Sequence, residues 1–349
     1  MKTDFNCPVC NSMQWQNGET FLYAKTDGER PYSKYASLLR KLKLFWRILI
    51  FARPERQTLR CNSLNTYEKL RSKVLFDVWF KDKKDEIELQ SLVCHSCGFI
   101  CYTPRPDDND ISEKYAYLNR HYGKPSNSHP VTQDVERAER IYRQCMEFTN
   151  KAQLNVLDYG GGDGRLLMPF QNDGHSCFVV DYYEFPIAGI TKLGNDIQDA
   201  QIDRKFDIII CSHVLEHVSD VSNLLTRLKD YLKDDGILYG EVPQEVWAGL
   251  RIDPDPVTHI NFFTKNSFLN LFLVHGFEIL ASKRLISNFG ASALEVVWAI
   301  VRPNQSQNHN LLPVDTEEML YPSRAYSLKR LYGVFVEPKL KKLQQSRIK

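Results

Sequence analysis

The stretch NVLDYGGGDGRLL sets glycines between acids and could bind a cofactor. Gly160, Gly162 and Gly164 recur at every second position and follow Asp158. A glycine turn between a strand and a helix lets a ligand approach the backbone without meeting a Cβ atom. The dinucleotide fingerprint has a different spacing, G-x-G-x-x-G, and holds a pyrophosphate at the helix N-terminus. Asp158 and Asp163 would repel a pyrophosphate, so the stretch favours a ligand with a cationic ammonium or sulfonium group.

A second acid, Asp181, ends the apolar run CFVVD 17 residues after Gly164. An acid at the tip of the second strand of such a unit can accept hydrogen bonds from both hydroxyls of a ribose. A glycine turn alone is common and could be a tight βα turn that holds no cofactor. The turn together with an acid that ends the next strand is much more specific, and it indicates a nucleoside-type cofactor.

Two C-x-x-C pairs supply four thiolates, the ligand set of a structural zinc ion. The pairs are Cys7 with Cys10 and Cys94 with Cys97. The 83 residues between the pairs must loop out as a separate excursion if all four cysteines meet. The alternative is two unpaired turn motifs, and neither pair opens a helix as a redox dithiol does. We expect a zinc ion that orders an N-terminal lobe and takes no part in the chemistry.

The elements that must position these residues alternate from residue 155 onward. Short apolar runs are separated by amphipathic or glycine-rich stretches, which is typical of a parallel, doubly wound α/β sheet. The predicted strands are NVLDYG, CFVVDY, FDIIIC and ILYGEV, with GFEILASKR and SALEVVWAIV as a closing pair. The predicted helices are GRLLMPFQN and VSNLLTRLKDYL.

These motifs, in this order, resemble those of class I S-adenosylmethionine (SAM)-dependent methyltransferases. The resemblance rests on LDYGGGDG, VVD, FDIIICSHVLEHV and LKDDGILYGEVP, and on HINFFTKNSFLNLF followed by HGFEI. The cysteine pairs with the following Pro-Arg-Pro resemble the zinc-ribbon front end of a subset of that group, whose members often belong to polysaccharide or secondary-metabolite pathways. The match covers roughly residues 1–25 and 90–300. It implies a Rossmann-like fold with an N-terminal zinc-ribbon lobe that carries a basic helical insertion.

The resemblance also implies roles for individual residues. The acid and glycines of the loop would hold the methionine end of SAM, and Asp181 would bind its ribose. Tyr182 would lie beside the adenine, with Asp196 and Ile197 as further adenine contacts. His213, just after the fourth strand, would face the cofactor. The residues of the loop are Asp158, Gly160, Gly162 and Gly164.

Methyl transfer to an alcohol requires a group that removes the acceptor's proton, typically a histidine or a carboxylate. The candidates outside the glycine loop are His213, Glu216 and His217 in SHVLEHV, Glu241 at the end of the fifth strand, and His259 in THINFF. We expect the His259→Ala change to leave cofactor affinity near normal and to abolish turnover.

The SHVLEHV segment could instead bind a metal ion. Positions i, i+3 and i+4 share one face of a helix, so His213, Glu216 and His217 would converge there, and His259 could complete the site. Some O-methyltransferases of this fold bind a divalent ion with E-x-x-E-H and a distant histidine, but here His213 replaces the first glutamate. The plainer alternative is that Glu216 and His217 tie a helix start to neighbouring loops.

Basic charge is concentrated in two blocks outside the predicted catalytic region. Residues 30–60 carry a net charge of +8 and residues 323–349 carry +7, within a chain whose total is +2. Residues 36–51, ASLLRKLKLFWRILIF, form an amphipathic helix in projection, with Trp46 on the apolar face. Such a helix could lie on an anionic membrane, pack on the catalytic domain or, less favourably, bind nucleic acid.

Composition is that of a soluble globular protein, and the length is sufficient for two domains. The chain has 349 residues, of which 43% are hydrophobic and 25% charged. No signal peptide or run of about 18 apolar residues is evident, and nine cysteines favour thiolates in a reducing compartment. We therefore expect a cytoplasmic protein, with contact at the inner face of the membrane as an option.

The sequence predicts three segments and one activity. Residues 1–110 would form the zinc-ribbon lobe with its insertion at about 26–90, residues 111–302 the methyltransferase domain, and residues 303–349 a basic extension. The predicted function is SAM-dependent methyl transfer, with an oxygen of a sugar, glycan or other small molecule as acceptor. The alternatives are an RNA or protein methyltransferase, and an inactive scaffold of the same fold.

Overall fold

The computed structural model describes residues 4–24, 57–60, 72–82, 86–122, 132–196, 200, 202–246, 257–289, 292–304 and 310–315. The helix predicted over 36–51, the basic block at 323–349 and the adenine contact at Ile197 lie outside the described residues, and their roles stay predictions. Within the described part, no helix combines the length and apolar composition that a bilayer crossing requires.

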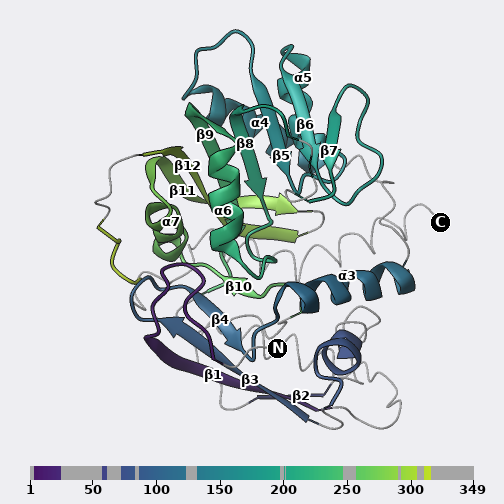
Figure 1. Ribbon diagram of the computed structural model, residues 1–349, viewed down its shortest axis with the longest axis vertical. Coiled ribbons are helices and arrows are strands. Elements are labelled where there is room, and N and C mark those ends of the chain that lie inside the picture. Colours follow the sequence, from purple (N-terminus) through teal and green to yellow (C-terminus); the bar gives the residue numbers. More distant parts are fainter. Residues whose placement is uncertain are drawn as a thin grey trace, which may run out of the picture.

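A seven-stranded sheet forms the larger half of the molecule, in the order β11-β12-β9-β8-β5-β6-β7 (Figure 1). The five strands from β9 to β7 are parallel, β12 runs antiparallel to β9, and β11 runs antiparallel to β12. This confirms the predicted doubly wound, mostly parallel sheet. The strands are β5 (Asn155–Tyr159), β6 (Ser176–Val180), β7 (Thr191–Gly194), β8 (Phe206–Ser212), β9 (Leu232–Pro243), β11 (Phe277–Phe289) and β12 (Ser292–Pro303).

Helices cover both faces of this sheet, because alternate strand residues point to opposite sides and both sides are apolar. Val156 and Ile208 share a buried core with one set of helices, and Leu157 and Ile209 share a core with the other. The first set is α4 (Thr132–Met146), the 3₁₀ turn η3 (Arg165–Leu167) and α5 (Met168–Asn172). The second set is α6 (Val221–Asp230) and α7 (Lys265–Val274).

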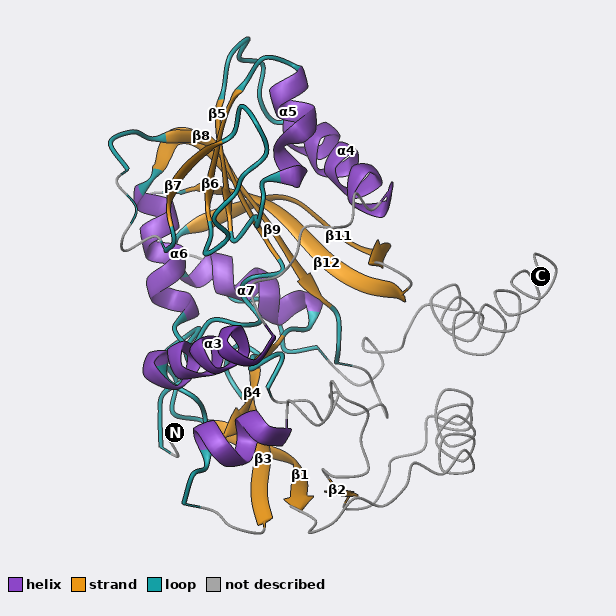
Figure 2. Cartoon of the chain, turned by 90° about the vertical axis from the view of Figure 1, so that its right-hand side faces the viewer, coloured by secondary structure: helices purple, strands orange, loops and turns teal. Residues whose placement is uncertain are grey.

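A second, five-stranded sheet lies below the first, in the order β10-β4-β3-β1-β2 (Figure 1). Most of it comes from the N-terminal segment, but β10 comes from the segment after β9 and pairs antiparallel with β4. Its strands are β1 (Trp15–Ala24), β2 (Gln57–Arg60), β3 (Glu86–Cys94), β4 (Ile100–Thr103) and β10 (Asn261–Phe262). The π-helical turn η2 (Val74–Trp79) and helix α3 (Asp108–Tyr122) lie beside it (Figure 2).

The two sheets share one hydrophobic core. Cys94 and Phe99 of the N-terminal lobe pack in the same buried cluster as Leu225 of α6 and Phe268 of α7. A hydrogen bond reinforces this packing, because the side-chain amide of Asn270 in α7 donates to the backbone carbonyl of Cys97 (3.2 Å). The lobe and the larger sheet are therefore joined by a continuous interior.

The order of the larger sheet locates the expected binding edge. From β5 the chain runs outward through β6 to β7 and then returns to β8 on the opposite side of β5. Ligands of open α/β sheets bind beyond the carboxyl ends of the strands at such a reversal. The segments that leave β5, β6, β8 and β9 at this edge hold the predicted site.

Candidate active site

The glycine loop leaves β5 as a tightly folded turn. The Gly160 amide donates to the Val180 carbonyl of β6 (2.8 Å), which anchors the loop to the sheet. A Cβ atom on Gly161 would lie 2.2 Å from Asp158 Oδ2, so only glycine can stand there without displacing the carboxylate. Gly162 has φ +60°, and a Cβ there would meet no atom within 4 Å. The loop thus places the carboxylate against its backbone and leaves open space over Gly162.

Asp158 is a buried carboxylate with one uncompensated oxygen. The residue is 1% exposed, and its Oδ2 has no hydrogen-bond partner among the described residues. Burial, together with the charges of Asp181 and Asp163, raises the pKa of Asp158 to about 8, against the opposing effect of Arg137. An oxygen in this state is suited to a ligand that brings its own positive charge or hydrogen-bond donor.

Asp181 lies beside the loop, as predicted, but both its oxygens contact backbone amides. Oδ2 accepts from Gly162 (2.9 Å) and Oδ1 accepts from Tyr183 (2.7 Å). Tyr182 is 70% exposed, and its hydroxyl lies 3.5 Å from Asp196 Oδ2 beyond β7. The structure brings these residues to one edge, where a nucleoside could lie between Asp181 and Tyr182.

The sequence suggested that Asp163 adds negative charge to the glycine loop, but in the structure this carboxylate is paired. Arg165 pairs with it through Nε and Nη2 (both 2.9 Å), and the Arg165 amide also donates to it (3.2 Å). Arg165 in turn reaches Asp134 of α4 (2.9 Å). Asp163 is therefore neutralised within the loop, and Asp158 is the acid of the loop that offers an unpaired oxygen.

The segment after β8 is a turn and not the helix on which the metal-site spacing was based. His213 has a positive φ of +59°, and residues 215–217 form a turn that ends before α6. A Cβ atom on Gly160 would lie 2.4 Å from Val214 Cγ2, so this turn packs directly on the glycine loop. The prediction of a shared helix face was wrong, because His213 adopts the left-handed conformation that ends the strand.

The three histidine side chains nevertheless lie around Glu216. Its Oε1 lies 3.3 Å from His213 Nδ1 and 3.8 Å from His217 Nε2. One ligand atom each from Glu216, His217 and His259 lies within 4.8 Å of the others. Glu216 is 1% exposed, and neither of its oxygens accepts a well-aligned hydrogen bond among the described residues.

The rings of His217 and His259 are both oriented by a contact at Nδ1. His217 Nδ1 lies 2.7 Å from the Thr258 carbonyl, and His259 Nδ1 lies 2.7 Å from Glu245 Oε2. A carbonyl or carboxylate beside Nδ1 fixes the proton on that nitrogen, so Nε2 is the basic nitrogen of each neutral ring. The rings meet edge to face with centroids 4.8 Å apart.

The pKa values of Glu216 and His217 are shifted in ways that fix the charge of each side chain. Burial lowers the pKa of His217 to about 4, so this ring is neutral at pH 7. Burial alone would raise the pKa of Glu216, but His213 and the other two histidines lower it to about 2. A buried, ionised carboxylate therefore faces the neutral ring of His217, and although burial acts in the opposite direction, Glu216 and Glu241 raise the pKa of His213.

Both carboxylate oxygens of Glu241, a predicted catalytic candidate, are held by neighbouring side chains. It is fully buried, and it pairs with Arg137 (3.1 Å) and Arg140 (2.7 Å) of α4 and accepts from Tyr239 (2.8 Å). Although burial acts in the opposite direction, His213 and the two arginines hold the pKa of Glu241 well below its usual value. This geometry makes Glu241 an anchor between β9 and α4 and leaves it no oxygen for a substrate proton.

Sequence reasoning missed several residues of this edge. Lys114 of α3 is buried and donates to the Val257 carbonyl (3.1 Å), and the adjacent Tyr115 ring lies 4.6 Å from its ammonium. Glu245, which orients His259, was also missed. No local pattern marks these residues, since each reaches the site only through the packing of a distant segment.

The four predicted cysteine ligands meet at the junction of the lobe with α6 and α7. Cys7 Sγ lies 3.6 Å from Cys97 Sγ, and Cys10 Sγ lies 3.5 Å from Cys94 Sγ. All four sulfur atoms lie within 4.8 Å of one another. Sulfurs bonded tetrahedrally to zinc at about 2.3 Å would be about 3.8 Å apart, so the four thiols fit that ion.

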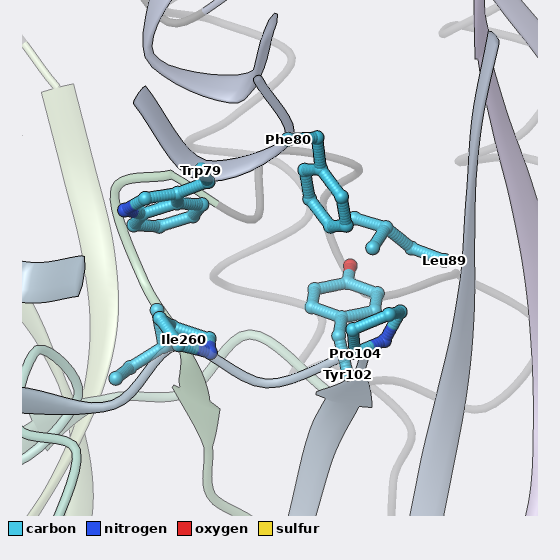
Figure 3. A pocket seen from close by; sticks show the side chains of 7 residues that line it. Trp79, Phe80, Leu89, Tyr102, Pro104 and Ile260 are labelled. Carbon is cyan, nitrogen blue, oxygen red and sulfur yellow. The ribbon is translucent and has the colours of Figure 1, made fainter. Parts of the chain in front are cut away.

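A small apolar pocket lies beside the site, between the lobe and the segment that precedes β10 (Figure 3). Trp79 and Ile260 form one side, and Phe80, Leu89 and Tyr102 form the other. Its cavity volume of about 10 Å³ leaves room for roughly one water molecule, and we do not assign it to an acceptor.

The raised pKa of Asp158 predicts how stability depends on pH. The protonated carboxyl stabilises the fold fully below pH 4, and this stabilisation is lost as the pH rises to about 8. The Asp158→Asn variant should therefore be more stable than the wild type at pH 8 by roughly 1–3 kcal/mol, with little difference at pH 4.5. Thermal unfolding of the unliganded protein at both pH values measures this. Asp203→Asn, on the surface, is the control, and an equal effect of Asp158→Asn at both pH values would contradict the assignment.

Parts of the chain are similar to known methyltransferases. Residues 133–282 match a family model described as a methyltransferase domain. Among curated relatives, ubiquinone biosynthesis O-methyltransferase of Rickettsia akari is 27% identical over 114 residues, which are 29% of this chain and 45% of that protein. The same-named protein of Nitrobacter winogradskyi is 31% identical over 126 residues, 31% of this chain and 48% of that protein. The chain thus spans about half the length of these relatives.

Solved structures of similar shape include the 1,6-didemethyltoxoflavin-N1-methyltransferase of Burkholderia thailandensis, with S-adenosylhomocysteine bound. Its TM-score is 0.44 at 18% identity, over 56% of this chain and 89% of that chain. The N-methyltransferase NodS of Bradyrhizobium japonicum gives 0.41 at 14% identity, over 55% and 98%. Together with the order of the larger sheet, the family match shows that residues 133–282 form a class I SAM-dependent methyltransferase domain.

Proposed function

We propose that this protein transfers the methyl group of SAM to a hydroxyl oxygen of a small molecule, with His259 as the group that takes the acceptor's proton. The observation that carries this proposal is the pair of His259 with Glu245, whose Nδ1 and Oε2 lie 2.7 Å apart. A carboxylate that holds Nδ1–H leaves Nε2 basic and stabilises the imidazolium that forms when a proton arrives.

The cofactor supplies an electrophilic methyl group on a sulfonium, and the chain supplies binding and orientation. Asp158 Oδ2 and the open space over Gly162 would receive the charged methionine end of SAM. Asp181 would exchange its backbone contacts for the ribose hydroxyls, with Tyr182 and Asp196 beside the adenine. His213 packs between Glu216 and Glu241 and would form the wall of the site beneath the methyl group.

Transfer of the methyl group to a hydroxyl requires that the hydroxyl proton be removed. Bound SAM would supply the methyl group to the acceptor oxygen and keep the electrons of the carbon–sulfur bond on its sulfur, and His259 Nε2 would take the hydroxyl proton. The names of the curated relatives support oxygen as the methylated atom, and a sugar or glycan hydroxyl is the acceptor class we would test first.

Zinc at Cys7, Cys10, Cys94 and Cys97 is part of the proposal as a structural ion. The four sulfur atoms have the spacing of a tetrahedral site, and they lie in the core shared by the lobe and helices α6 and α7. Peripheral contact with an anionic membrane rests on residues 36–51 and 323–349 alone. The alternative is an RNA or protein acceptor, which the same basic segments would favour.

The His259→Ala variant tests the proton acceptor. We expect SAM affinity to stay near that of the wild type and turnover to fall by roughly 10²–10⁴, because general base catalysis is lost. Glu245→Gln should keep the ring but weaken its orientation, with a smaller loss. The assay follows labelled methyl from SAM into fractionated extract, and His121→Ala, on the exposed side of α3, is the control. Full turnover in His259→Ala would remove this residue from the mechanism.

A divalent ion at Glu216, His217 and His259 is a second candidate for the acceptor side, favoured by the convergence of these three ligands within 4.8 Å. An ion there would lower the acceptor's pKa directly, and His259 would act as ligand in place of base. Titration with Mn²⁺, followed by electron paramagnetic resonance, separates the two mechanisms because manganese avoids thiolate sites. One site that is lost in Glu216→Gln would establish the ion, and no binding would leave His259 as the base.

A further inference from the structure

Arg105 is a buried cation that joins the N-terminal lobe to the active-site segments. It follows β4 between Pro104 and Pro106 and is 4% exposed. Its guanidinium donates to three acceptors: the Ile260 carbonyl (3.1 Å), the Ser219 carbonyl (2.8 Å) and Asn261 Oδ1 (2.7 Å). All three belong to the two segments that carry Glu216, His217 and His259.

Asn261 extends this contact into the turn after β8. Its side-chain amide donates to the carbonyls of Leu215 (2.6 Å) and Val218 (2.7 Å). The backbone amides of Ile260 and Asn261 both donate to the Glu216 carbonyl (2.9 and 3.1 Å). The positions of Glu216 and of the residue just before Ile260, His259, therefore depend on one small network with Arg105 at its lobe-side end.

The same guanidinium faces the cysteine cluster. Strand β10 pairs with β4 in a register that sets Asn261 opposite Cys101. The Arg105 guanidinium lies 5.8 Å from the ring centre of Phe99, and Phe99 belongs to the buried core that also contains Cys7 and Cys97. Arg105 interacts electrostatically with Cys101, with Cys7 and, beyond ion-pair distance, with Asp220.

The charge of Arg105 needs a counterpart. A buried guanidinium is costly unless a negative group compensates it. No carboxylate lies within ion-pair distance of Arg105 in the described part of the chain. Four thiolates around one Zn²⁺ leave two negative charges on the cluster, and they would compensate the arginine across the shared core.

We propose that Arg105 is a positioning residue through which the metal-loaded cysteine cluster holds the segments at 213–219 and 257–262 in their active arrangement. The consequence for turnover rests on the proposed methyl transfer, whereas the consequence for structure rests only on the proposed zinc ion. The N-terminal lobe would then be a part of the frame that holds the active site.

A purely structural role for Arg105 predicts a different pattern. If the residue only filled the core, its replacement would loosen both sheets together. If it positions the active-site segments, its replacement should loosen those segments and leave the glycine loop and Asp181 unchanged, since these lie on β5 and β6 and do not contact it.

Hydrogen exchange measured by mass spectrometry on the full chain distinguishes these patterns without an acceptor. The Arg105→Lys variant keeps the charge beside the cysteines but loses the planar fork that reaches three acceptors. We expect exchange at 213–219 and 257–262 to rise by roughly 10–100-fold, as for the loss of a charge-assisted hydrogen bond, with exchange at 155–164 and 176–181 unchanged. Arg143→Lys, on the exposed face of α4, is the matched control.

Metal content and SAM affinity complete the test. Arg105→Lys should retain the zinc content and the SAM affinity of the wild type while its turnover falls. Removing zinc from the wild-type protein with a chelator should raise exchange in the same two segments, and restoring zinc should reverse this. Unchanged exchange there in Arg105→Lys with zinc bound would overturn the proposal, as would an equal rise at 155–164. A failure of methyl transfer in the wild type would instead count against the proposed function.

Discussion

The constraint on which this structure depends is the compensation of negative charge buried at one edge of a sheet. Glu241 is paired with two arginines of α4, and Asp163 is paired with Arg165. Asp158 and Glu216 differ, because one buried oxygen of Asp158 and both oxygens of Glu216 lack well-aligned donors among the described residues. Compensated acids fix α4 and the glycine loop in place, whereas the two uncompensated acids stand where a cationic ligand and an acceptor or ion would meet them.

The lobe and the domain are interleaved along the chain. Strand β10 belongs to the lobe's sheet, although it lies in the chain between β9 and α7 of the domain. The segment that carries His259 is thus held from both sides, by Glu216 from the domain and by Arg105 from the lobe. A cysteine cluster can in this way influence chemistry without contacting a substrate.

Much of the fold could be predicted from the sequence, because it depends on local patterns. Alternating apolar and amphipathic runs gave the strands and helices of the larger sheet, and the acid after β6 was placed beside the glycine loop for the same reason. The convergence of Cys7 and Cys97 was also predictable, since metal-ligand spacing constrains the fold across a long insertion. The zinc ion itself and the roles of the site residues stay proposals.

The remainder depends on contacts between distant segments. The turn at His213 replaced an expected helix because the strand ends in a left-handed residue. Gly161, and not its neighbours, makes room for the Asp158 carboxylate, and no spacing rule distinguishes it. Glu245 and Arg105 acquire their partners, His259 and Asn261, only when the two sheets pack together.

The central claim is that the edge formed by Asp158, Gly162 and Asp181 binds SAM. Isothermal titration of the purified chain with S-adenosylhomocysteine tests it most directly, because the product shares the nucleoside and amino-acid ends of the cofactor and needs no acceptor. We expect one site per chain with a Kd of roughly 100 µM or tighter, weakened at least about tenfold in Asp181→Ala. Absence of binding to the wild type, or equal binding to Asp181→Ala, would contradict the account.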